Sequence, residues 1–170
     1  MRRNGIYQYY VEGDNEKKLI NTLKQELKCI QAGKVDIFNP VQERFNNTRL
    51  RPLRTGTMVV LVYDTDTDSV GILKDNIYFL KKQSVIKDVI CIPQVRRLED
   101  ELVRACNIKN ILELTKSSSE KDFKRDFNKC TNLDDVLKNT DFDMGKMWNQ
   151  MPQNDFVAFG NDSQRIKLIS

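Results

Sequence analysis

The feature that most constrains the fold is a continuous apolar run, MVVLVY over residues 58–63, which is followed at once by Asp64, Asp66 and Asp68. A short, valine-rich run without polar alternation is typical of a strand buried on both faces at the centre of a parallel sheet. Ligands in open α/β sheets bind just beyond the carboxyl ends of the strands. Three carboxylates there repel one another unless a cation neutralises them, and hard oxygen ligands suit Mg²⁺ or Mn²⁺. The alternative is a solvated acidic turn whose side chains cap the next helix.

The rest of the chain alternates between strand and helix patterns. We expect strands over residues 6–11, 35–38, 58–63 and 85–93, and amphipathic helices over residues 16–31, 70–82 and 96–107. This alternation predicts an α/β fold with a mostly parallel four-stranded sheet flanked by helices. Short helices are expected within residues 117–130, 132–138 and 144–151, and a brief strand over residues 156–159. The sequence thus predicts one domain: an α/β core over residues 1–110 with a small helical elaboration, residues 111–170, packed on it.

The chain contains no histidine, and this absence excludes several classes of site. Ser-His-Asp and Cys-His catalysis and mixed Cys/His zinc sites cannot be built. The cysteines are far apart in sequence, so no CxxC metal motif exists, and we expect buried free thiols at Cys29, Cys91, Cys106 and Cys130. Acid–base chemistry therefore has to use carboxylates, lysine, tyrosine or a metal-bound water.

The charge pattern favours a polyanionic partner. The net charge is +4, from 28 basic and 24 acidic residues, and gathering several acids in one site leaves the remaining surface more basic. Residues 42–57 carry several arginines, which match phosphate oxygens, although a solvated connector is an equal alternative. No apolar run reaches the length of a membrane span, and the first residues lack a signal-peptide core, so we expect a cytoplasmic protein.

Two acidic motifs in strand context resemble the Toprim domain. The first is VEGDNE, residues 11–16, after the first expected strand, and the second is VYDTDTD, residues 62–68, at the end of the central strand. This domain is shared by topoisomerases, bacterial primases, OLD-family nucleases, recombination proteins and small maturation ribonucleases. The resemblance covers roughly the first hundred residues. The carboxyl ends of parallel strands point the same way, so the two motifs are expected to converge.

The resemblance implies roles for six acids. Glu12 would match the family's invariant glutamate, a metal ligand or general acid–base, and Asp64 and Asp66 its two metal-binding aspartates. Together they would form the catalytic set. The remaining metal-binding candidates are secondary: Glu16 as the second acid of an EGxxE variant, Asp68 as a third acid, and Glu99 as the glutamate after the fourth strand. For Glu99, an acid that stabilises a helix dipole is an equal alternative.

The departures from the family point to its nuclease branch. The chain has no room for the further domains of topoisomerases or primases, and no GxxxxGK[ST] loop for an ATPase of its own. The expected activity is Mg²⁺- or Mn²⁺-dependent hydrolysis of DNA or RNA. By analogy, a separate ATPase subunit in an anti-phage defence system would be a partner. Candidate phosphate contacts are Arg51, Arg54 and Lys167, among which the sequence does not choose.

Two rival functions stay open at this stage. VVLVYDTDT also fits the first motif of haloacid-dehalogenase-like phosphatases, with Asp64 as nucleophile and Asp66 as general acid. That motif normally begins its fold, whereas a complete strand–helix–strand precedes it here. The second rival is a catalytically idle Toprim-like module that binds a partner or nucleic acid.

Overall fold

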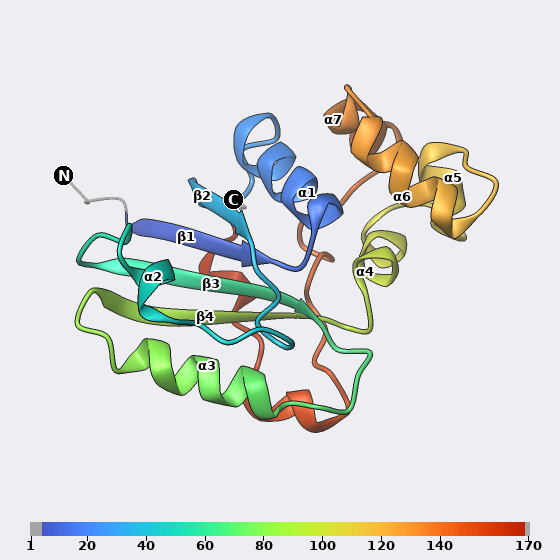
Figure 1. Ribbon diagram of the computed structural model, residues 1–170. Coiled ribbons are helices and arrows are strands. Elements are labelled where there is room, and N and C mark those ends of the chain that lie inside the picture. The colour runs from blue at the N-terminus through green and yellow to red at the C-terminus, as the bar shows by residue number, and fades with distance from the viewer. Residues whose placement is uncertain (1–4, 169–170) are drawn as a thin grey trace.

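The sheet of this protein is four-stranded and entirely parallel. We describe residues 5–168 of a computed structural model (Figure 1). The strands are β1 (Ile6–Val11), β2 (Gly33–Ile37), β3 (Thr57–Asp64) and β4 (Ile86–Gln94), in the order β2-β1-β3-β4. The predicted α/β class, with a mostly parallel four-stranded sheet flanked by helices, is confirmed. All four strands end at the same edge, which lies to the right in Figure 1.

Helices cover both faces of the sheet, because alternate residues of β3 point to opposite sides. Val60 and Val62 belong to one apolar cluster, and Val59 and Leu61 belong to the other. The first cluster is completed by α1 (Asp14–Gln25), α4 (Leu98–Ala105), α5 (Leu112–Thr115), α6 (Glu120–Lys129) and α7 (Leu133–Asn139). The second is completed by α2 (Asn47–Leu50), α3 (Gly71–Lys81) and the 3₁₀ helix η1 (Asp155–Phe159). A second 3₁₀ turn, η2 (Ser163–Arg165), follows near the end of the chain.

Three local predictions were wrong. The first helix ends at Gln25 rather than at residue 31, because Lys28 has a left-handed φ of 51° and the Cys29 amide bonds back to the Leu23 carbonyl. Residues 156–159 form part of η1 instead of a strand. Residues 144–151 make turns rather than a helix, and Trp148 within them has a φ of 54°.

The C-terminal segment lies along β4 and protects its free edge. The Asp162 amide donates to the Cys91 carbonyl at 2.8 Å, and its carboxylate accepts from the Cys91 amide at 3.1 Å. An ion pair of 2.9 Å joins Arg165 to Asp88 of the same strand. These contacts occupy backbone groups that an edge strand otherwise exposes. Within residues 5–168, no helix combines the length and the apolar character that crossing a bilayer requires.

Candidate metal centre

The strand register brings the two acidic motifs together at the carboxyl edge of the sheet. Val11, the last residue of β1, pairs with Val62 of β3, so Glu12 follows β1 within one residue of the level of Asp64. Helix α1 begins at this edge, and Glu16 lies in its first turn. Only the extended Gly13 separates Glu12 from the start of α1, so the first turn of this helix carries Glu16 back beside Glu12. Two motifs about fifty residues apart in sequence thereby share one site.

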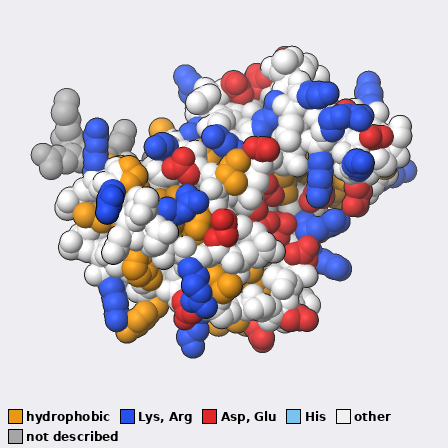
Figure 2. All heavy atoms as spheres, in the orientation of Figure 1, with side chains coloured by type: hydrophobic (Ala, Val, Ile, Leu, Met, Phe, Trp, Pro, Cys, Tyr) orange, Lys and Arg blue, Asp and Glu red, His pale blue; other side chains and the backbone are white. Residues whose placement is uncertain are grey.

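Glu12, Glu16 and Asp64 form a compact carboxylate triad. One oxygen from each lies within 4.8 Å of the others, and all three side chains are half-buried. In the described part of the chain, no ion pair involves any of the three. Figure 2 shows acidic side chains gathered in a hollow beside the helices that follow β4. The triad therefore concentrates negative charge without a protein cation bound directly to it.

Burial, and then the crowding of charge, raises the pKa values of all three carboxyls. Burial, the neighbouring Glu12 charge and a hydrogen bond shared with Glu12 raise the pKa of Asp64 to about 9. Burial and then the charges of Asp64 and Glu99 raise the pKa of Glu16 to about 7. Burial is also the main cause that raises the pKa of Glu12. Such shifts are typical of functional sites, since isolated carboxylates in water keep ordinary pKa values.

The donor set of the triad suits a hard divalent cation. Carboxylate oxygens are the ligands that Mg²⁺ and Mn²⁺ prefer, and Mg²⁺ commonly keeps several waters alongside a few protein oxygens. A cation would replace the mutual repulsion with attraction and return the pKa values to lower ones. Glu12, Glu16 and Asp64 are thus the residues that would hold it.

Asp64 is oriented by a buried side chain, Gln94, the last residue of β4. The Gln94 amide Nε2 donates to Asp64 Oδ1 at 2.8 Å, and its Oε1 accepts from Trp148 Nε1 at 3.2 Å. Gln94 and Trp148 are both fully buried. Because an indole N–H can only donate, it fixes which end of the amide faces Asp64. The C-terminal segment thereby sets the geometry of the triad.

The other three predicted acids lie near the triad but outside it. Asp66 is exposed, and its charge raises the pKa values of Glu12 and Asp64, so it is within electrostatic reach. Glu99 is buried and raises the pKa of Glu16. Asp68 is exposed and lines a separate cavity with Asp66. The triad is therefore formed without Asp66, Asp68 or Glu99.

The three predicted phosphate contacts do not reach the triad. Arg51 and Arg54 precede β3, so they lie at the opposite end of an eight-residue strand from Asp64, roughly 25 Å away at about 3.3 Å per residue. Lys167 is buried, and its ammonium donates to the Met147 carbonyl. Burial also lowers the pKa of Lys167. None of these side chains can bind a phosphate held at the triad.

Sequence reasoning missed Gln94 and Lys124, a cation whose charge acts on Glu16. Lys124 of α6 lowers the pKa of Glu16, and α6 is fixed to α1 by hydrogen bonds from Asn15 Nδ2 to the Lys124 carbonyl at 3.0 Å and to Asn128 Oδ1 at 2.8 Å. No local pattern marks Lys124, since the contact spans more than a hundred residues. Gln94 could have been found from the sequence, because it is a polar residue at the end of an apolar strand.

The loops after β3 and β4 are joined to each other beside the triad. The Thr65 amide donates to the Arg96 carbonyl at 2.9 Å, and the Arg96 amide donates to the Thr65 hydroxyl at 3.1 Å. Arg96 has a left-handed φ of 71°, which is uncommon for a residue with a side chain. This connection fixes Asp64 and Gln94 relative to one another.

A search for similar proteins found no match among protein-family models, curated proteins or solved structures. The resemblance to Toprim proteins therefore rests on the two acidic motifs and on where the fold puts them.

Proposed function

We propose that this protein is a Mg²⁺- or Mn²⁺-dependent nuclease that hydrolyses phosphodiester bonds of DNA or RNA. The observation that carries the proposal is the triad of Glu12, Glu16 and Asp64, whose oxygens lie within 4.8 Å of one another. These are three of the six acids for which the Toprim resemblance implies metal binding. They come from three separate elements that meet at the edge where α/β sheets bind ligands.

The side chains around the triad suit hydrolysis of a phosphate diester. A bound Mg²⁺ would polarise a phosphate oxygen and acidify a water. Glu12, which lies beside Asp64 in the triad, is the group to accept the proton of the attacking water on a carboxylate oxygen. The new P–O bond forms as the bond to the leaving alkoxide breaks, and that oxygen takes up a proton. Gln94 keeps Asp64 in one orientation, and Lys124 places positive charge on the α6 side.

The carboxylate triad favours the nuclease over the phosphatase alternative. A haloacid-dehalogenase-like reaction needs Asp64 as nucleophile and a nearby aspartate as acid, but it assigns no role to Glu12 or Glu16. In this protein those two glutamates are the residues that crowd Asp64. Covalent labelling of Asp64 by a phosphate mimic would reverse this preference.

The biological setting is part of the same proposal. A chain without an ATP-binding loop would rely on a separate ATPase if it acts as the effector of an anti-phage system, as the analogy with divided defence systems suggests. Co-purification with a neighbouring gene product tests this part independently of the chemistry.

The decisive experiment removes charge from the triad while keeping the shape of each side chain. We expect Glu12→Gln and Asp64→Asn each to lower cleavage of labelled DNA and RNA oligonucleotides in Mn²⁺ by at least a hundredfold, with melting temperatures near that of the parent protein. Asp14→Asn is the matched control, because Asp14 is exposed and lies between Glu12 and Glu16 in the sequence. Cleavage by both triad variants at the parent rate would refute the assignment.

Calorimetry with Mn²⁺ separates the nuclease from the idle binding module. Saturable binding that depends on Asp64, together with cleavage, supports the enzyme. Binding without cleavage, with and without the partner, supports the idle module instead.

A further inference from the structure

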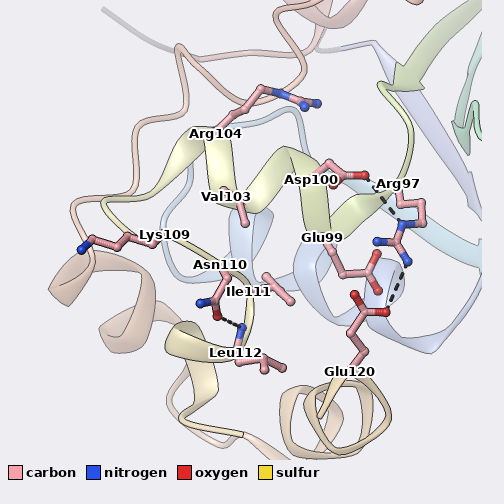
Figure 3. Close-up of a pocket in the computed structure, with 10 residues that line it drawn as sticks. All are labelled: Arg97, Glu99, Asp100, Val103, Arg104, Lys109, Asn110, Ile111, Leu112 and Glu120. Carbon is pink, nitrogen blue, oxygen red and sulfur yellow. Dashed lines mark hydrogen bonds and ion pairs between the residues drawn. The ribbon is translucent and has the colours of Figure 1, made fainter. Parts of the chain in front are cut away.

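A cavity opens beside the triad between α4, α5 and α6. It has a volume of about 400 Å³, in the range of sites that hold small organic ligands. Figure 3 shows Val103 of α4 and the pair Ile111 and Leu112 facing one another across it. Glu99, Arg97 and Glu120 close one end, whereas Arg104 points away and donates to the Val95 carbonyl. The cavity thus combines apolar walls with a charged rim.

The rim connects the cavity to the carboxylate triad. Glu99 lines the cavity from the first turn of α4. Asn15, the residue before Glu16, donates to the Lys124 carbonyl of α6 at 3.0 Å, and Glu120, one turn earlier on α6, lines the same rim. A ligand in the cavity would therefore lie beside a group bound at the triad.

The polar groups of the cavity have free capacity for hydrogen bonding. Asn110 Oδ1 accepts from the Leu112 amide at 3.0 Å, which leaves the Asn110 NH₂ group free to donate (Figure 3). Arg97 makes only long ion pairs, 3.7 Å to Asp100 and 3.5 Å to Glu120, from partly exposed side chains. Exposed ion pairs of this kind contribute little to stability, so a phosphate can compete with the carboxylates for the Arg97 guanidinium.

We propose that this cavity holds one unpaired nucleobase of the substrate strand, next to the phosphate bound at the triad. The faces of the base pack against Val103, Ile111 and Leu112, its polar edge meets the Asn110 amide, and Arg97 contacts the adjoining phosphate. A base inside a duplex is stacked and paired and cannot enter such a cavity without being flipped out. The inference rests on the proposed nuclease function and specifies its substrate class as single-stranded nucleic acid.

The test compares a filled cavity with an altered polar edge. Val103→Phe adds a ring to the wall, and Asn110→Asp keeps the acceptor for the Leu112 amide while removing the NH₂ donor. We expect Val103→Phe to raise KM for single-stranded oligonucleotides at least tenfold, with kcat and the Mn²⁺ affinity unchanged, and the parent protein to prefer single strands over duplex. Asn110→Asp is expected to change the relative KM values among the four homopolymers. An unchanged KM in both variants, or equal cleavage of duplex and single strand by the parent protein, overturns the proposal.

A binding measurement keeps this test separate from the nuclease assignment. Methyl NMR of Ile111 and Leu112 is followed during titration with nucleoside monophosphates in Mg²⁺. We expect their shifts to move in the parent protein and to stay fixed in Val103→Phe, whether or not cleavage is detected. Movement without cleavage supports the cavity and contradicts the nuclease; cleavage without movement does the reverse. If Val103→Phe fails to fold, Asn110→Asp provides the same comparison.

Discussion

The side-chain amide of Gln94 donates a hydrogen bond of 2.8 Å to Asp64 Oδ1 and accepts one of 3.2 Å from Trp148 Nε1. Burial and the neighbouring Glu12 charge raise the pKa of Asp64 to about 9. These two hydrogen bonds therefore connect the proposed metal centre to the C-terminal segment through the buried Trp148. Groups that orient metal ligands in this way commonly change metal affinity by about 10–100-fold when they are removed.

The first prediction concerns Gln94 as a positioning residue. Gln94→Met keeps a side chain of similar length that tolerates burial, but it removes the amide that donates to Asp64. We expect the Mn²⁺ dissociation constant to rise by about tenfold or more. Calorimetry on the purified variant measures this directly.

Trp148→Phe serves as the graded comparison for Gln94→Met. It removes the donor that fixes the Gln94 amide but leaves Gln94 in place, so a smaller loss of Mn²⁺ affinity is expected. Unchanged affinity in Gln94→Met, in a variant that melts as a folded protein, would show that Asp64 keeps its orientation without the amide.

A second prediction uses Trp148 as an optical reporter. It is the sole tryptophan of the chain, fully buried, and one hydrogen bond away from the side chain that contacts Asp64. We expect Mg²⁺ titration to change its fluorescence intensity saturably, because metal binding alters the charge that polarises Gln94. Asp64→Asn should abolish the change, whereas Asp14→Asn should leave it intact. A flat signal in a protein that binds Mg²⁺ by calorimetry would contradict the coupling.

The part of the site that was predictable from sequence depends on strand topology. The apolar run of β3 identified a central parallel strand, and parallel strands necessarily end at one edge, so the meeting of Glu12 and Asp64 followed. The prediction of Arg51 and Arg54 as phosphate contacts overlooked the same rule, because both precede β3 in the chain and so lie at its opposite end. That error was avoidable, since residues before a parallel strand cannot lie beside residues after it.

The parts that could not be predicted are contacts between distant segments. Gln94 meets Asp64 only because β3 and β4 pair in the register that puts those two residues side by side. Trp148 contacts Gln94 because its own backbone has a left-handed conformation, and no periodic pattern of apolar residues predicts that turn. From the sequence, Lys167 is expected to be an exposed cation. In the structure it pairs with Ile30 in an isolated antiparallel bridge and is buried. Each depends on long-range packing rather than on local propensity.

The third prediction concerns the pH dependence of the metal-free protein. The folded pKa values of the triad lie above ordinary carboxyl values, so the folded state favours the protonated forms. The corresponding stability is present at about pH 4 and is lost as pH rises through about 7 and about 9, the values for Glu16 and Asp64. We expect the melting temperature in EDTA to fall between pH 5 and pH 9.

Two controls isolate the triad from the rest of the protein. Asp64→Asn should flatten the decline in melting temperature, because it removes the carboxyl whose pKa is raised from its ordinary value of 3.8 to about 9. Mg²⁺ should raise the melting temperature of the parent protein more at pH 9 than at pH 5, since protons compete with the cation at the lower pH. A melting temperature in EDTA that rises across this range, in parallel in both proteins, would show that the triad does not govern the effect.

The last prediction concerns Glu101, a fully buried carboxylate beneath the site. Its oxygens accept from the Val95 amide at 2.9 Å and the Trp148 amide at 3.2 Å, and it forms an ion pair of 3.0 Å with Arg104. Glu101→Ala leaves buried N–H groups and a half-buried guanidinium without their acceptor. We expect a loss of roughly 2–4 kcal/mol in the free energy of unfolding, and a melting temperature lower by about 5–10 °C.

Urea unfolding of Glu101→Ala measures this loss, with Glu26→Ala as the matched control because Glu26 is an exposed glutamate on the adjoining helix end. The control should change stability by less than about 0.5 kcal/mol. Since Glu101 bonds the segments that carry Gln94 and Trp148, the variant should also weaken Mg²⁺ binding at the triad. A destabilised Glu101→Ala protein with parent Mg²⁺ affinity, measured where it is fully folded, would show that the triad keeps its geometry independently of the C-terminal segment.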